Sequence, residues 1–515
     1  MKKILFTHPY FLALDPKQAD AGLPYPPLGT LYAAALAREQ GYEVSFFDSM
    51  FALSGEEILQ PLESNRPNVF VVYADGFNYL TKMCLTNMRE ATFRMIRIAR
   101  ASGCTVIVSS SDSTDHSQAY LEAGADFVIN GEAEWTLMEL LESLQDGDGP
   151  AGQPADPATP QTAAATPQAA AAQSADSRSR IKGLAYLDAS TTVHQTAPRP
   201  VMKDWSILPS PAFDLVDIER YRATWLKQVG YFSLNMATTR GCPFHCNWCA
   251  KPIYGNRYTA RPAEQVVQEL KQLKERYHFD HIWFCDDIFG LKPGWVSAFA
   301  DAVQREGLDF AYKIQSRADL LVEENTIKDL ARSGCGSVWM GAESGSQRIL
   351  DAMDKGTTVG QIEQATRLLH ENGIRPCFFI QFGYPGETKE DIDLTVRMIR
   401  KLLPHDIGIS VSYPLPGTGF YEKVKASLGP KSNWTDSDEL ALMFRNTYSP
   451  AYYKQLYRYV HRIHRQHMAI HYLSQWRRRK ITAAVLRKIA AFCYYLPAAR
   501  LARIKLDHLE TVAYE

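Results

Sequence analysis

Two stretches of this chain alternate short apolar runs with amphipathic helical patterns, and each stretch predicts a parallel sheet. In residues 1–145 the apolar runs are short and bounded by polar turns, as buried strands are. They are KILFTH (3–8), EVSFFD (43–48), NVFVVY (68–73), CTVIVSS (104–110) and DFVIN (126–130). Helical patterns connect these runs and follow the last one. We therefore expect an α/β domain with a doubly wound parallel sheet.

Polar segments follow most of these predicted strands. They are HPY (8–10), ADGFN (74–78), SSSDSTDH (109–116) and NGEAE (130–134). Sheets of this kind bind ligands outside the carboxyl ends of their strands. A ligand site of the first domain is therefore expected at these four segments.

The second alternating stretch covers residues 231–430. Its predicted strands are FSLNMATTR (232–240), HIWFCDD (281–287), AYKIQS (311–316), SVWMGAES (337–344), PCFFIQFG (376–383) and IGISVSY (407–413). Between them lie amphipathic helices, such as the one that places Val266, Leu270 and Leu273 on one face. Six such units predict a partial (β/α)6 barrel whose active face lies at the strand carboxyl ends.

The remaining segments connect or follow these two domains. Residues 146–182 are rich in Ala, Pro, Gln and Gly and lack an apolar face, which predicts a disordered low-complexity linker. Residues 183–230 form a connecting segment. Residues 431–515 show helical and basic patterns. Two interpretations of this C-terminal region stay open: a solvated pair of capping helices, or helices that make a weak membrane-surface contact.

Composition narrows the functional class. The chain has 515 residues and a formal net charge of −1, so it lacks the basic footprint of a nucleic-acid-binding protein. The opening MKKILFTHPY turns polar too early for a signal peptide, and no apolar run is long enough to span a bilayer. We expect a cytoplasmic protein, where clustered cysteines indicate metal binding or catalysis more often than disulfides.

The segment RGCPFHCNWCAKP (240–252) contains three of the nine cysteines, Cys242, Cys246 and Cys249. A cluster of four irons and four sulfides needs four ligands, and thiolates are the usual ones. Three thiolates leave one iron open to a further molecule, the arrangement that distinguishes catalytic from closed structural metal sites. The alternative interpretation is a structural zinc knuckle, which needs a fourth ligand nearby.

This spacing, with Trp248 before the third cysteine, resembles the signature of the radical S-adenosylmethionine (SAM) superfamily. The resemblance implies that Cys242, Cys246 and Cys249 hold a [4Fe–4S] cluster as the catalytic metal centre. It implies that SAM chelates the open iron and is cleaved reductively to a 5′-deoxyadenosyl radical. A reductant protein of the flavodoxin or ferredoxin type is the implied electron donor, and the implied substrate is a small molecule.

The same resemblance implies SAM contacts at the ends of the later barrel strands. The matching segments are FCDDIF, QSR, GAESGS and IQFGYPGET. The implied SAM-binding residues, with Trp248 of the cysteine loop, are Asp286, Asp287, Gln315, Arg317, Glu343, Ser344, Ile380, Gly383 and Glu387. Each of these segments alone could be an ordinary turn, since aspartates often cap helices.

The first domain resembles the Rossmann- or flavodoxin-like cobalamin-binding domain of cobalamin-dependent radical SAM enzymes. The matching segments are PYPPLGTLYAAALAREQGYEV (24–44) and ADFVINGEAEWTLMELL (125–141). The DxHxxG motif of classical cobalamin domains is absent, and SSSDSTDH replaces the usual glycine-rich turn. The implied cobalamin contacts are Ser110, Asp112, Asp115, His116, Gly131 and Glu132. A helix-capping role of the polar turn, or a domain that has lost cobalamin, is the alternative.

Together the two domains predict a cobalamin-dependent radical SAM enzyme that methylates an unactivated carbon. Two alternatives stay open. One is a radical oxidative cyclase or rearrangement enzyme that uses cobalamin without methyl transfer. The other, of a different class, is a non-catalytic iron–sulfur sensor or assembly protein.

Overall fold

The computed structural model of the protein describes most of the chain in seven ranges. They are residues 2–77, 86–145, 178–188, 190–251, 253–429, 442–475 and 483–511. Most of the predicted linker, residues 146–177, lies outside the described residues, as do residues 476–480 of the basic C-terminal stretch. The chain divides into two compact units, described separately below. The first comprises residues 1–242, 251–261 and 273–280, and the second residues 243–250, 262–272 and 281–515.

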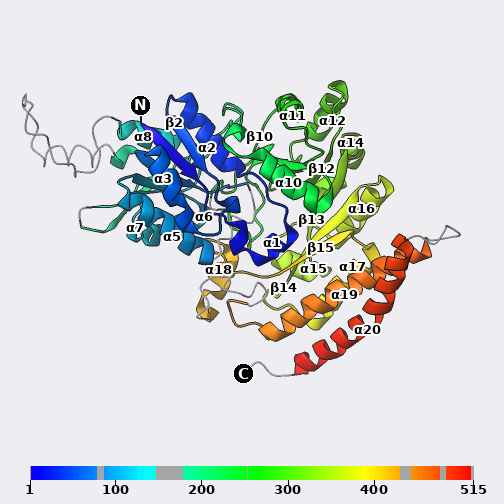
Figure 1. The fold of residues 1–515 in the computed structure, drawn as a ribbon. Coiled ribbons are helices and arrows are strands. Elements are labelled where there is room, and N and C mark those ends of the chain that lie inside the picture. The colour runs from blue at the N-terminus through cyan, green and yellow to red at the C-terminus, as the bar shows by residue number, and fades with distance from the viewer. Residues whose placement is uncertain are drawn as a thin grey trace, which may run out of the picture. The chain divides into compact units, whose positions relative to one another are not determined.

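The first unit contains the predicted parallel sheet (Figure 1). Its parallel strands pair in the order β2-β1-β3-β4-β5, the flavodoxin-like order. They are β1 (Lys3–Thr7), β2 (Glu43–Phe47), β3 (Val69–Tyr73), β4 (Thr105–Ser109) and β5 (Phe127–Ile129). The prediction of a doubly wound sheet is confirmed. Buried parallel strands read as unbroken apolar runs, which explains why the pattern located them within a residue or two.

Helices cover both faces of this sheet. One core contains Leu5, Phe70 and Val108 of the strands, packed against helices that include α3 (Leu59–Asn65), α5 (Thr86–Ala101) and α7 (Ser117–Glu122). The alternate strand positions, such as Phe6 and Val71, are also fully buried. On that side α2 (Leu28–Glu39) packs against β1 and β3, and α8 (Glu134–Ser143) packs against α2.

Two antiparallel strands extend the sheet beyond β5. They are β6 (Leu184–Leu187) and β7 (Val193–Gln195), and the order continues as β5-β6-β7. The apolar pattern did not predict them, because β7 is short and largely exposed. The connecting segment therefore contributes to the sheet of the first unit. Its helix α10 (Ile218–Val229) follows a short turn after Phe213–Leu215.

The parallel sheet of the barrel region has the order β15-β14-β13-β12-β11-β8. The strands are β8 (Ser233–Met236), β11 (His281–Phe284), β12 (Ala311–Ser316), β13 (Cys335–Glu343), β14 (Arg375–Phe382) and β15 (Asp406–Val411). The connecting helices include α11 (Ala263–Tyr277), α12 (Trp295–Arg305), α14 (Thr326–Arg332), α16 (Val359–Glu371) and α17 (Lys389–Leu402). Six strands in chain order confirm the predicted partial barrel.

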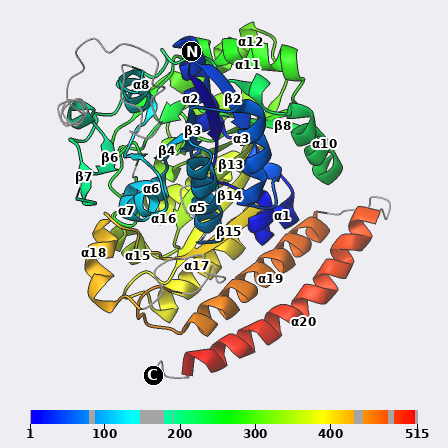
Figure 2. The ribbon, with the colours of Figure 1, turned by 60° about the vertical axis from the view of Figure 1, so that its left-hand side comes forward.

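The C-terminal region is helical, as predicted. Helices α19 (Pro450–Ser474) and α20 (Ala483–Thr511) lie side by side (Figures 1 and 2). Gln455 donates to the carbonyl of Ala502 at 2.9 Å, and Arg503 of α20 pairs with Asp393 of α17 at 2.9 Å. Among the described helices, none is long and apolar enough to cross a membrane. Contact with a membrane surface stays a prediction.

Candidate active site

The cysteine loop begins and ends on a short ladder of the first unit. Strand β9 (Thr239–Arg240) pairs antiparallel with β10 (Thr259–Ala260), so residues 241–258 form a loop closed at its base. Gly241 has φ +76°, and a Cβ at this position would lie 2.3 Å from the carbonyl oxygen of Arg257. Only glycine fits this left-handed turn, which places Cys242 at the start of the loop.

The central part of the loop belongs to the second unit, where Asn247 holds it with both main chain and side chain. Its Nδ2 donates to the carbonyl of Ala352 at 2.8 Å and to Asp354 at 2.7 Å. Its Oδ1 accepts from the hydroxyl of Tyr384 at 3.0 Å. Its main-chain oxygen accepts from the N–H of Phe420 at 2.8 Å. Asn247 thus fixes the residues between Cys246 and Cys249.

Cationic side chains of the barrel lie beside Cys246. Nη1 of Arg317, at the end of β12, is 3.9 Å from Sγ of Cys246, and its guanidinium lies 3.6 Å from the ring centre of Phe244. Asp319 and the carbonyl of Lys355 hold the other guanidinium nitrogens at 2.9–3.0 Å. The buried Arg317 therefore holds the loop and places a positive charge beside the sulfur of Cys246.

Lys355 adds a second buried charge. Its ammonium donates to Glu343 at 2.8 Å and lies 5.9 Å from the ring centre of Trp248. Burial lowers the pKa of Lys355, but Glu343 and Cys246 raise it above its ordinary value, so the ammonium stays charged. Glu343 ends β13 with φ +54°, an uncommon conformation for a residue with a side chain. Such strained positions often occur in functional sites.

These groups fit an iron–sulfur cluster held by three thiolates. Soft thiolates suit iron–sulfur clusters, and such an assembly carries net negative charge that Arg317 and Lys355 would balance. Within the described ranges, no group of three or more His, Cys, Asp or Glu side chains has the geometry to hold a single metal ion. In a four-iron cluster each thiolate binds a different iron, so its cysteines stand farther apart than the ligands of one ion.

The other predicted SAM residues lie at the ends of their strands. Asp286 is buried after β11 and Asp287 is partly exposed, while Gln315 of β12 is partly exposed. Ser344 is fully buried and its hydroxyl lies 3.1 Å from that of Thr395, so it packs within the protein. Ile380 of β14 is buried and paired in register with Glu343. Their roles in SAM binding stay predictions.

Gly383 and Glu387 form one local turn after β14. The N–H of Gly383, at φ +75°, donates to Oε2 of Glu387 at 2.6 Å. Oε1 of Glu387 has no hydrogen-bond partner among the residues that the structure describes. Burial raises the pKa of Glu387 to about 8, and the charge of Asp391 adds to this effect. The turn therefore contains a buried acid that takes up a proton near neutral pH.

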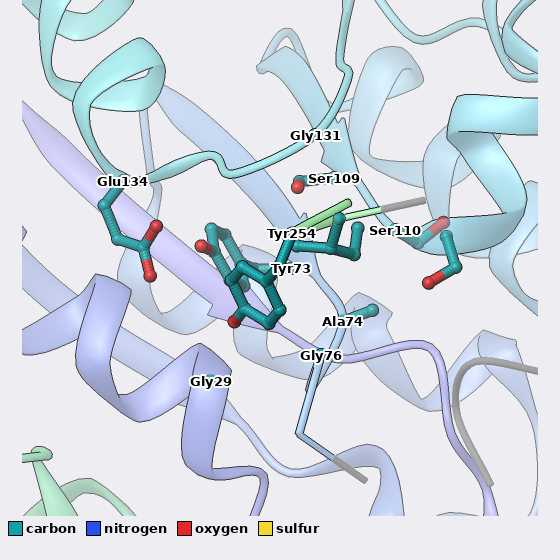
Figure 3. Close-up of a pocket in the computed structure, with 11 residues that line it drawn as sticks. Gly29, Tyr73, Ala74, Gly76, Ser109, Ser110, Gly131, Glu134 and Tyr254 are labelled. Atoms are coloured by element: carbon teal, nitrogen blue, oxygen red, sulfur yellow. The ribbon is translucent and has the colours of Figure 1, made fainter. Parts of the chain in front are cut away.

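The carboxyl edge of the first sheet forms a second candidate site. A hollow of about 20 Å³ opens there, enough for one group the size of a water molecule (Figure 3). Its lining residues come from the segments after β3, β4 and β5, from α2, and from residues 253–254. They are Gly29, Tyr73, Ala74, Gly76, Ser109, Ser110, Ser111, Gly131, Glu134, Ile253 and Tyr254. Seven of the eleven are Gly, Ala or Ser, so this rim carries few bulky side chains, which fits the close approach of a planar corrin.

Only two of the predicted cobalamin residues, Ser110 and Gly131, line this hollow. Ser110 also caps helix α6 (Ser111–Asp115) through a reciprocal pair of hydrogen bonds with Ser113. Asp112 is held by Arg89 at 2.5–2.7 Å and by the hydroxyl of Tyr120 at 2.6 Å. Asp115, the last residue of this helix, and His116, which follows it, are exposed. The polar turn therefore acts as a helix cap in this structure.

Glu132 is bound by a residue that sequence reasoning missed. The fully buried Arg240 donates to Oε1 of Glu132 at 2.6 Å and to Oε1 of Glu134 at 2.7 Å. The rings of Trp205, Phe77 and Tyr254 surround its guanidinium at 4.7–5.4 Å. Burial lowers the pKa of Arg240, but the charges around it, led by Glu134, raise it well above its ordinary value. Arg240 immediately precedes Gly241 and Cys242 of the cysteine loop, and this position beside the motif is the signal that could have identified it.

Comparison with known proteins places this geometry in context. Residues 236–399 match the model of the radical SAM superfamily. The chain is 26% identical over 403 residues to an uncharacterized methyltransferase of Pyrococcus horikoshii, PH0819, covering 77% of this chain and 78% of that protein. It is 24% identical over 430 residues to an anaerobic magnesium-protoporphyrin IX monomethyl ester cyclase of Cereibacter sphaeroides, covering 82% of this chain and 64% of the cyclase.

Among solved structures, the cobalamin-dependent SAM radical enzyme OxsB with aqua-cobalamin bound has a similar fold. The TM-score is 0.70 with 15% sequence identity, and the match covers 98% of this chain and 72% of OxsB. At this identity the likeness is one of fold. The match to OxsB includes residues of both units, since it covers 98% of the chain.

Proposed function

Because residues 236–399 match the radical SAM superfamily, we propose that the chain is a cobalamin-dependent methyltransferase that acts on an unactivated carbon of a small molecule. The observation that carries the proposal is the presence of two sites in one chain. One is the thiolate loop with its cationic neighbours Arg317 and Lys355. The other is the small-residue rim at the carboxyl edge of a flavodoxin-like sheet.

Each group of residues has a distinct task in this proposal. Cys242, Cys246 and Cys249 would hold a [4Fe–4S] cluster, and Glu343 and Glu387 are candidates for contacts to SAM. The rim around Ser110 and Gly131 would hold cobalamin. When bound, the cluster and SAM would supply a carbon-centred radical, and cobalamin would supply the methyl group.

The chain's own residues would set the conditions for this chemistry. Arg317 and Lys355 would stabilise negative charge on the cluster, since both are buried and held by carboxylates in fixed positions. Asn247 would keep the loop in one conformation by its contacts to Ala352, Tyr384 and Phe420. Two similar proteins support the proposal. They are the uncharacterized methyltransferase PH0819, which is similar in sequence, and the cobalamin-dependent OxsB, which is similar in fold.

The test begins with anaerobic reconstitution of the full chain with iron and sulfide, with and without hydroxocobalamin. The ultraviolet–visible spectrum then reports both cofactors. The loaded protein is incubated with SAM and a strong reductant, and 5′-deoxyadenosine and S-adenosylhomocysteine are quantified by mass spectrometry. We expect both products from the natural sequence. Formation of 5′-deoxyadenosine with no S-adenosylhomocysteine would contradict methyl transfer.

Two variants make the test specific to the loop. Cys246→Ala should lose the cluster absorbance and both products. Cys335→Ala, at a buried cysteine of β13 outside the loop, should retain them. Cleavage of SAM by the Cys246→Ala variant would contradict the assignment of the loop.

A radical cyclase is the second candidate function, favoured by the 24% identity to the anaerobic cyclase of Cereibacter sphaeroides. The two functions differ in the mass of the product. Methylation adds one CH2 unit to the substrate, whereas oxidative cyclisation removes hydrogens. A product lighter than its substrate would therefore favour the cyclase.

A further inference from the structure

One buried oxygen atom beside the hollow lacks a partner. Glu134 is only 2% exposed, and its Oε1 accepts from Arg240 at 2.7 Å. Its Oε2 has no hydrogen-bond partner within the described part of the chain. A buried charged acceptor that remains unpaired is strongly unfavourable, since it has lost its water without replacement. Such an atom indicates a donor that the described residues do not supply.

The unmet acceptor can be assigned to Glu134 alone. Both oxygens of Glu132 are used, because Oε1 accepts from Arg240 and Oε2 from the N–H of Met202. The two carboxylates share one guanidinium, and Arg240 bonds only Oε1 of Glu134. A donor is therefore needed on the side of Glu134 that faces away from Arg240.

That side is the hollow at the carboxyl edge of the sheet. Glu134 lines it together with Tyr73 and Tyr254, and Figure 3 shows the carboxylate directed towards the side where these rings lie. Gly131, with φ +78°, and Gly76 add no side chain to the hollow, and Ile253 and Tyr254 lie within 4 Å of where their Cβ atoms would be. The volume of about 20 Å³ has room for one terminal group of a ligand, but not for a whole ligand.

We propose that Glu134 accepts a hydrogen bond from a primary amide on the periphery of bound cobalamin, whose ring lies over the rim. This inference rests on the proposed function. Cobalamin carries acetamide and propionamide side chains, and the NH2 end of one of them is uncharged, donates two hydrogen bonds and is close to water in size. A carboxylate in the same place would be repelled by Glu134. The hollow is thus a subsite selective for amide over acid.

The first measurement is the affinity of the full-length, cluster-reconstituted protein for hydroxocobalamin, followed by absorption spectroscopy. Glu134→Gln should bind roughly 10- to 100-fold more weakly, because a charge-assisted hydrogen bond is lost. The control is Glu139→Gln on the same helix, α8. The side chain of Glu139 is 47% exposed and pairs with Arg199. The Glu139→Gln variant should therefore bind hydroxocobalamin as tightly as the natural sequence does.

The second measurement separates ligand contact from a structural effect. Cobalamin monocarboxylic acids, each with one amide hydrolysed to an acid, are titrated against both forms of the protein. One isomer should bind the natural sequence far more weakly than cobalamin does, and Glu134→Gln should reduce that difference. This isomer series also tests the natural sequence by itself, so the result does not depend on folding of the variant.

The outcomes are distinct. If the natural sequence binds cobalamin, discriminates against no isomer and is unaffected by Glu134→Gln, the hollow holds only water. The inference then fails and the proposed function stands. If the natural sequence binds no cobalamin, the cobalamin part of the proposed function fails, and the inference fails with it.

Discussion

Nη1 of Arg317 lies 3.9 Å from Sγ of Cys246, so a barrel strand presents a fixed positive charge to the thiolate loop. Donors to cluster sulfurs and nearby charge are two of the factors that set the potential of an iron–sulfur centre. The reduced cluster carries more negative charge than the oxidised one. Arg317 should therefore stabilise the reduced state.

Replacing Arg317 should make the cluster harder to reduce. We expect Arg317→Gln to shift the midpoint potential to more negative values and to lower SAM cleavage about 10- to 100-fold. Arg317→Lys keeps the charge and should shift it less. The measurement is a redox titration followed by electron paramagnetic resonance. Arg367→Gln, at an exposed pair with Glu371, serves as the control, and an unchanged potential in Arg317→Gln would refute the role.

Asn247 should determine how well the loop retains iron. Asn247→Asp places a carboxylate beside Asp354 and the carbonyl of Ala352, so it should be more harmful than Asn247→Ala. We expect iron affinity to fall roughly 10-fold or more in Asn247→Asp. Iron and sulfide are assayed after reconstitution and desalting. Asn372→Ala, which removes a contact at the end of α16, should retain normal iron content.

The buried pair of Lys355 and Glu343 predicts an asymmetric response to mutation. Lys355→Met leaves the carboxylate of Glu343 buried without its partner and should lower the free energy of unfolding by about 3–5 kcal/mol. The double variant Lys355→Met/Glu343→Gln should recover part of this loss. Denaturant titration followed by tryptophan fluorescence measures both. The exposed pair of Lys401 and Glu363 supplies the control, since Lys401→Met should change stability by less than about 1 kcal/mol.

Glu387 predicts a pH dependence of stability. Its pKa of about 8 in the folded protein exceeds that of an unfolded glutamate, so the folded state binds the extra proton between about pH 5 and pH 8. Its contribution to stability is fully present below about pH 4.5 and is lost as pH rises through about 8. Glu387→Gln should remove this dependence. The melting temperature of the variant should therefore increase relative to that of the natural sequence as pH rises. A constant difference from pH 5 to pH 9 would refute the assignment.

The parts of the fold that depend on local pattern could be predicted from the sequence. The central strands β3 and β4 are fully buried and read as unbroken apolar runs, and the cysteines are close in the chain. Strand β7 (Val193–Gln195) could not be predicted, because a short and largely exposed edge strand carries little apolar signal. Strand β6 is buried, but its apolar run has only four residues.

The site residues that were missed act through contacts between distant parts of the chain. Arg240 meets Glu132 and Glu134 across 106–108 residues, and Asn247 meets Tyr384 across 137 residues. No spacing rule connects such positions. The turn SSSDSTDH was predicted to bind cobalamin but caps a helix in the structure. Helix caps and ligand-binding turns use the same residue types, so the sequence does not distinguish them.

The burial of Arg240 between Glu132 and Glu134 also bears on how the protein is made. During translation, Glu132 and Glu134 leave the ribosome more than 100 residues before Arg240 does. The nascent N-terminal domain therefore contains two carboxylates whose cationic partner has not yet been synthesised. Its interior can close only once the segment around Arg240 has been synthesised. Expression of residues 1–145 alone should therefore yield a fragment prone to aggregation or proteolysis, and useful truncations should extend past position 242.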